Sequence, residues 1–271
     1  MKGELLVTDL TRMFGNRVCV AGYVSGVGCV RPLDWHGYHL EESWLSVGER
    51  YIRPFDVVEI DLLEHRPDPP HTEDWITNPA SRRYVRSVGA AERPKWLVAH
   101  DDRAVDQIFG TLVHRDHGSY VTEGEGNRSL GTVGISRLDR VMYDAEYGDW
   151  EYRLAFADGF GQHYRLAVTD LAFRYYLDHL RVREGLSAPA AAQRVFRELA
   201  SADWVYLRVG LARHWKKFPD RCYLQITGVY SYPDYLGGRC FADLALSDEE
   251  LDARRTAPDP DGTVALDDLP F

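Results

Sequence analysis

The stretch from Trp204 to Tyr230 restricts the possible folds more than any other part of the chain. Two runs, 204–211 and 221–230, are rich in β-branched and aromatic residues and alternate apolar with polar side chains over much of their length. A short connection joins them, so the pattern predicts a β-hairpin. A chain that holds such a hairpin between other strand-like segments is expected to build a β-sheet structure.

The connection between these two runs is basic and aromatic. It places three positive charges and two rings on a segment that has to cross the surface, where exposed Trp and Phe are costly: Arg213, Trp215, Lys216, Lys217 and Phe218. We predict that this loop binds phosphates and stacks on bases. Two alternatives stay open, namely that the rings fold back as a hydrophobic lid over solvated cations, and that the loop contacts a protein.

Short strand-like runs fill most of the remaining chain. They cover residues 17–24, 28–33, 53–63, 138–147, 149–157 and 161–169. Asp170 can cap a helix through Leu180, and Ser187 begins a second helix with Pro189 in its first turn. No Gly-rich strand-to-helix turn is present, so the expected fold class is mainly β with inserted α: two small β-barrels in tandem.

Turn-rich sequence at residues 118–127 predicts the connection between the barrels. The expected domains are residues 1–128, a barrel with its connecting segment, and residues 129–238, a barrel with a helical insert. We expect a short helix within residues 102–112 and a basic segment at residues 80–88. Residues 239–271 form an acidic tail that we expect to be mobile.

The charge of the chain is unevenly distributed. The net charge is −10, but residues 243–271 hold nine acidic and only two basic residues, so the rest of the chain is close to balance. A near-neutral body can carry local basic patches. No apolar run approaches the roughly 20 residues of a membrane span, and no signal peptide is evident, so we expect a cytoplasmic protein with no membrane contact. The four cysteines show no CxxC spacing and are predicted to be reduced.

Six short motifs occur in an order that resembles the bacterial dual OB domain family. They are Arg17–Gly22, Val30–Leu33, Phe55–Ile60, His71–Trp75, Leu166–Asp170 and Cys222–Leu224, within a similarity that covers residues 5–230. The resemblance implies two OB-type barrels and an accessory component of bacterial defence or conflict loci that binds nucleic acid. The long insert at residues 180–202 and the acidic tail depart from the family pattern.

OB barrels commonly bind oligonucleotides on the face of their second and third strands and on the flanking loops. We therefore expect a nucleic-acid partner, single-stranded rather than duplex. Arg31 precedes Pro32 in extended backbone and is a further candidate for phosphate contact. The alternative for Arg31 is an ion pair with an acidic residue between Asp56 and Glu64.

His71, Glu73 and Asp74 form a possible polar site, because an imidazole near two carboxylates can do acid–base work or hold a metal. No nucleophile or third ligand follows locally. The alternative is structural, with Thr72 or Asp74 bonding the backbone and Trp75 filling the barrel. His114 and His117 are spaced as a metal pair, but Gly118 disfavours a helix there. We predict no metal and no cofactor.

No hydrolase, metalloprotease or P-loop motif occurs, and no catalytic residue is predicted. The expected function is a non-catalytic module that binds nucleic acid or a nucleotide-like ligand. The alternative is a protein-interaction adaptor that docks on a partner enzyme through its barrel surfaces and through residues 243–271.

Overall fold

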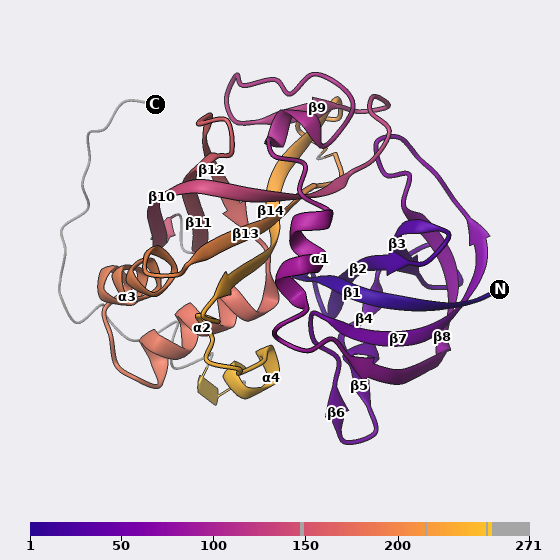
Figure 1. Ribbon diagram of the computed structural model, residues 1–271, viewed down its shortest axis with the longest axis horizontal. Helices are drawn as coiled ribbons and strands as arrows, with labels where there is room; N and C mark the ends of the chain where they lie inside the picture. Colours follow the sequence, from indigo (N-terminus) through magenta and orange to yellow (C-terminus); the bar gives the residue numbers. More distant parts are fainter. Residues whose placement is uncertain (147–148, 215, 248, 251–271) are drawn as a thin grey trace.

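The computed structural model describes residues 1–146, 149–214, 216–247 and 249–250, and it divides into two lobes, each built around one sheet (Figure 1). The fold is mainly β with inserted helices, as predicted. The first lobe contains the strands from the N-terminal part of the chain, and the second contains those from the C-terminal part.

The first sheet closes into a five-stranded barrel. Its strands are β1 (Lys2–Arg12), β2 (Arg17–Val24), β3 (Gly28–Leu33), β7 (Asp56–His65) and β8 (Asp74–Ser87). The order β1-β7-β8-β3-β2 is closed by pairing of β1 with β2, and β3 runs parallel to β8. Between β3 and β7 lie β4 (Leu40–Glu41), the 3-10 helix η1 (Glu42–Leu45), β5 (Ser46–Val47) and β6 (Arg50–Tyr51).

The second sheet repeats this topology. Its strands are β10 (Leu130–Glu146), β11 (Asp149–Asp158), β12 (His163–Val168), β13 (Trp204–Leu211) and β14 (Arg221–Tyr232). Parallel pairing of β12 with β14 closes the barrel, and β9 (Tyr120–Thr122) adds to the edge of β14. In both barrels the third and fifth strands are parallel neighbours, which makes them Greek-key barrels of the OB type.

Helices α2 (Leu171–Val182) and α3 (Ala188–Ala200) connect the third and fourth strands of the second barrel. The carboxylate of Asp170 accepts a hydrogen bond from the Phe173 N–H, and the Ser187 hydroxyl accepts one from the Ala190 N–H. The predicted cap at Asp170 and the predicted helix start at Ser187 are therefore confirmed. The predicted hairpin is confirmed too, because β13 pairs antiparallel with β14.

One local prediction was wrong. The helix expected within residues 102–112 is only the 3-10 turn η2 (Val105–Gln107), because Arg103 and Gly110 adopt positive φ angles of 64° and 68° that interrupt a helix. A helix forms earlier instead, as α1 (Arg93–Ala99). The basic segment at residues 80–88 belongs largely to β8.

The acidic tail starts later than expected. Helix α4 (Phe241–Leu244) is packed, with Phe241 buried in the core of the first barrel and Leu244 in that of the second. The mobility expected for residues 239–271 is therefore wrong for these four residues, since their apolar side chains anchor them between the barrels. Residues 251–271 lie outside the described part of the chain.

Two findings bear on the expected setting of the protein. No helix among the described residues is long and apolar enough to cross a membrane. All four cysteines are free thiols: Cys19, Cys29, Cys222 and Cys240.

Candidate nucleic-acid interface

The outer face of β10, β11 and β12 carries arginines separated by small residues. Along these strands apolar side chains alternate with polar ones, so one set fills the barrel and the other points outward. The inward row Val141, Leu154 and Leu166 is buried in the core. The sequence alternation therefore fixes which charged residues face solvent.

Two cross-strand rows define this outer face. In one row Arg140 pairs with Ala155, which pairs in turn with Arg165. The next row is Met142, Arg153, Ala167 and Gln225, which extends onto β14. The small alanines keep the surface low between the arginines, so an extended ligand can approach the strands.

Arg140 and Arg165 are the available cations of this face. Both are exposed, and neither forms an ion pair with another described residue. Arg153, by contrast, pairs with Glu151 at 2.7 Å. With strands about 4.8 Å apart, Arg140 and Arg165 stand roughly 10 Å apart on the two sides of β11. They can contact separate phosphates of one strand.

The predicted basic loop, residues 212–220, joins the fourth and fifth strands of this barrel and adjoins the same face. Lys216 and Lys217 are exposed, and Phe218 is half-buried with its ring 6.3 Å from that of Tyr223. Tyr223 lies two residues before Gln225 and so points to the same side of β14. The structure thus brings Phe218 to the end of the arginine face. Trp215 lies outside the described residues.

An arginine stands among the rings at this end. The Arg221 guanidinium lies 4.4 Å from the centre of the Tyr120 ring and 5.2 Å from that of Phe218. It also forms an ion pair with Asp116 at 3.4 Å. Aromatic faces beside cations are the elements that bind bases and phosphates of single-stranded nucleic acid.

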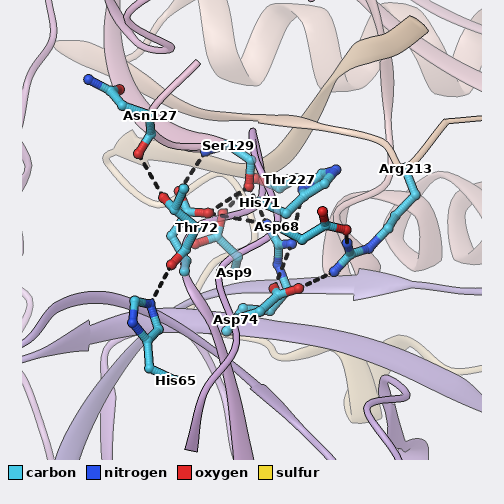
Figure 2. Close-up of polar contacts among 12 residues, drawn as sticks. Asp9, His65, Asp68, His71, Thr72, Asp74, Asn127, Ser129, Arg213 and Thr227 are labelled. Carbon is cyan, nitrogen blue, oxygen red and sulfur yellow. Dashed lines mark hydrogen bonds and ion pairs between the residues drawn. The ribbon is translucent and has the colours of Figure 1, made fainter. Parts of the chain in front are cut away.

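Arg213 does not project with the lysines. It forms an ion pair with Asp74 and lies 3.9 Å from Asp68, both of which belong to the first barrel (Figure 2). The loop of the second barrel is therefore tied to the equivalent loop of the first, residues 66–73. His214 also lies 3.4 Å from Glu123.

Arg31 is buried in a polar cluster between the barrels, with 4% of its surface exposed. It donates to Asp74 at 3.0 Å and to the Nδ1 atom of His71 at 3.1 Å, and it lies 3.9 Å from Glu73. The expectation of a partner between Asp56 and Glu64 was wrong, because the parallel pairing of β3 with β8 sets Arg31 beside Asp74. Enclosed in this way, Arg31 does not reach the surface to meet a phosphate.

The predicted polar site His71, Glu73 and Asp74 belongs to this same cluster. Glu73 accepts hydrogen bonds from the N–H and the hydroxyl of Ser129, at 2.6 and 2.8 Å, and so joins the first barrel to the start of β10. Thr72 donates to the Asn127 carbonyl at 2.7 Å (Figure 2). Trp75 does not fill the barrel but stacks on His65, with ring centres 4.8 Å apart.

His71 is held neutral. An arginine can only donate, so the Nδ1 atom of His71 accepts from Arg31 and the ring proton resides on Nε2. Burial, with the charge of Arg31, lowers the pKa of His71 to about 2. No group of three or more potential metal ligands occurs in the described residues, His114 and His117 included.

The equivalent face of the first barrel, on the outside of β1, β2 and β3, is less open to a polyanion. Its hollow of about 490 Å³ has Tyr23, Cys29 and Trp75 in its wall, but also the carboxylate-bearing Glu73. Its one arginine, Arg128, is paired with Asp102. The loop from residue 66 to 73 is largely committed to the second barrel. Among the described residues, the second barrel combines an exposed strand face with exposed lysines in the adjoining loop, and the 66–73 loop of the first barrel has no lysine.

Sequence reasoning missed Arg140, Arg153 and Arg165. The signal was present, because these residues occupy alternate positions in runs that also hold Leu154, Phe156 and Leu166. Each run was recognised as a strand, but the outward set was not followed from one strand to the next. The pairing register places these arginines in adjacent rows.

Comparison with known proteins agrees with the strand topology. A family model described as a dual OB-containing domain matches residues 10–229. No curated protein matches the chain. One solved structure, of a murine DNA-binding protein bound with double-stranded DNA, aligns with 85% of this chain and 96% of its own at 10% identity and a TM-score of 0.30. The assignment of the fold rests on the family match and on the strand order.

Proposed function

We propose that this chain, which belongs to the dual OB-containing domain family, is a non-catalytic protein that binds single-stranded nucleic acid. The observation that carries the proposal is the outer face of β10–β12. It presents Arg140 and Arg165 without carboxylate partners among the described residues. Arg165 lies on β12, the third strand, and Arg140 lies on β10, the first strand, beside the face that OB barrels use for oligonucleotides.

Single-stranded nucleic acid is favoured over duplex for two reasons. The rings of Phe218 and Tyr223 adjoin the face, and stacking on a base contributes about 1–3 kcal/mol. The chain also lacks the strong basic excess of a general duplex binder, since its net charge is −10.

A direct test is a binding screen of the full chain against single-stranded DNA, duplex DNA and RNA at two salt concentrations. We expect a single-stranded oligonucleotide to bind more tightly than the duplex of the same sequence, with affinity falling as salt rises. Equal or tighter binding of the duplex would contradict the strand preference. Absence of binding to all three would contradict the proposed function.

The cellular setting forms a further part of the proposal. We infer a cytoplasmic accessory role in a bacterial defence system, because motifs such as Phe55–Ile60 and His71–Trp75 resemble those of the bacterial dual OB domain family.

The second candidate function is an adaptor that docks on a partner enzyme. The nine acidic residues among positions 243–271 favour it, because blocks of like charge often serve as interaction tails.

A further inference from the structure

A cavity of about 380 Å³ lies between the two barrels, apart from the β10–β12 face. Its wall combines Leu10 of β1, Phe55 before β7, Leu171 of α2, Tyr230 of β14 and Phe241 of α4. Figure 1 shows α4 beside the seam between the lobes. The volume lies in the range of about 300–1,000 Å³ that is typical of small-molecule sites.

Three arginines line this cavity, and none of them pairs with a carboxylate in the described part of the chain: Arg53, Arg93 and Arg239. Arg93 donates from Nε to the Val88 carbonyl at 3.3 Å, and Arg239 donates from Nε to the Leu236 carbonyl at 3.0 Å. The Arg53 side chain donates to no described residue. The Arg239 guanidinium also lies 4.7 Å from the centre of the Tyr176 ring. The guanidinium groups of Arg53 and Arg93 in particular keep donors that can bind a phosphate through paired N–H groups.

The same wall is aromatic. The Phe55 and Tyr230 rings meet edge to face with centres 5.1 Å apart, and the Arg93 guanidinium lies 5.3 Å from the centre of the Phe55 ring. Tyr235 also lines the cavity, and its buried hydroxyl has no hydrogen-bond partner among the described residues. A buried hydroxyl without a partner is costly, so its presence favours a ligand that supplies one.

The carboxylates at this site are engaged by backbone groups. Asp170 accepts from the N–H groups of Phe173 and Val229 at 3.0 and 2.8 Å. Asp234, also in the wall, accepts from the N–H groups of Leu236 and Gly238 at 3.1 and 2.9 Å. Hydrogen bonds of Cys240, with the charges of Arg53 and Arg239, also lower the pKa of Asp243 on α4. None of these carboxylates forms an ion pair with the three arginines among the described residues.

We propose that this cavity binds a small phosphorylated ligand with a planar ring, of the size of a nucleoside monophosphate. Arg53, Arg93 and Arg239 bind the phosphate, and the aromatic wall around Phe55 packs against the ring. Both barrels contribute to the wall, so an occupied site links them. This inference is independent of the oligonucleotide interface, because none of the lining residues belongs to β10, β11 or β12.

The test uses adenosine 5′-monophosphate, adenosine and inorganic phosphate as probes, with isothermal titration calorimetry on the full chain. We expect saturable binding of the monophosphate, and binding at least about tenfold weaker for each of the other two probes. Arg53→Gln should weaken binding of the monophosphate by about tenfold. This variant breaks no described side-chain hydrogen bond, so the fold is expected to survive, and its thermal unfolding checks that.

Arg197→Gln is the matched control, because Arg197 is exposed on α3 and forms no ion pair with a described residue. It makes the same change of charge away from the cavity and should leave the affinity unchanged. The proposal is overturned if the intact protein does not bind the monophosphate, or if the Arg53 and Arg197 variants bind it equally well. If adenosine binds as tightly as its monophosphate, the arginines do not bind the phosphate group. If inorganic phosphate binds as tightly as the monophosphate, the aromatic rings do not contribute to binding.

Discussion

Arg208 of β13 and Asp9 of β1 form a fully buried ion pair between the two barrels, with 3.0 Å between Nε and Oδ2. Thr227 also donates to Asp9, and Arg208 donates to Thr132 at 2.9 Å. Because charges are costly to bury without partners, this cluster has to form together with the contact between the barrels. It makes the two barrels one structural unit.

The first prediction concerns this pair. Asp9→Ala should lower the free energy of unfolding by about 3–5 kcal/mol, since it leaves the Arg208 charge buried without a carboxylate. Urea unfolding followed by fluorescence measures it. Lys2→Ala is the control, because Lys2 pairs with Glu59 at the surface and such pairs contribute under about 1 kcal/mol. Equal losses in the two variants would show that the buried pair does not hold the barrels together.

The second prediction concerns pH. Burial, with the charge of Arg31, lowers the pKa of His71 to about 2 and that of His39 to about 3. Both rings are neutral when folded but take up protons below about pH 6.5 when unfolded. Their contribution to the free energy of unfolding is therefore complete above pH 6.5. It is lost as the pH falls, by up to about 1.4 kcal/mol per pH unit for each histidine.

Asp170 acts in the opposite direction. Burial raises the pKa of Asp170 to about 6. Its contribution to the free energy of unfolding is therefore complete below about pH 3.8 and is lost as the pH rises through 6. Between pH 6.5 and 4 we expect the two histidines to outweigh it. His71→Gln should flatten the loss of unfolding free energy measured at pH 7, 6 and 5. His36→Gln, which changes an exposed histidine, should not. An unchanged slope in His71→Gln would contradict the buried neutral state.

How far the sequence alone determines these features depends on the range of each interaction. The Asp170 cap and the hairpin of β13 and β14 were predicted because their signals are local. Arg208 and Asp9 are separated by 199 positions, and only barrel closure and docking bring them together. Arg31 likewise required the β3–β8 pairing, which no short motif reveals. Within the candidate interface, the sequence alone pointed to Lys216 and Lys217. Arg140 and Arg165 were recognised only from the pairing register of β10, β11 and β12.

The third prediction concerns the loop. Lys216→Glu with Lys217→Glu should weaken oligonucleotide binding and flatten its dependence on salt, because fewer counterions are released. Fluorescence anisotropy at several salt concentrations measures both. The control is Arg86→Glu, which changes an exposed residue of β8 that forms no ion pair with a described residue. Unchanged affinity in the lysine variant would remove the loop from the interface.

The fourth prediction separates the two candidate functions. Deletion of residues 251–271 spares the anchoring side chains Phe241 and Leu244, so the thermal stability should be retained. Oligonucleotide affinity should hold or rise, because five acidic residues are removed against two basic ones. Loss of a copurifying protein partner on this deletion would support the adaptor. If both affinity and partners are unchanged, the adaptor function as proposed here fails.

We propose above all that the second barrel binds single-stranded nucleic acid across Arg140 and Arg165. The most direct measurement is the salt dependence of oligonucleotide affinity for the native chain and for Arg140→Glu with Arg165→Glu, with Arg86→Glu as control. We expect the double variant to lose affinity by about tenfold or more at low salt, and its slope of log K against log salt to be reduced by about 1.4. Affinity and slope equal to those of the native chain would contradict it.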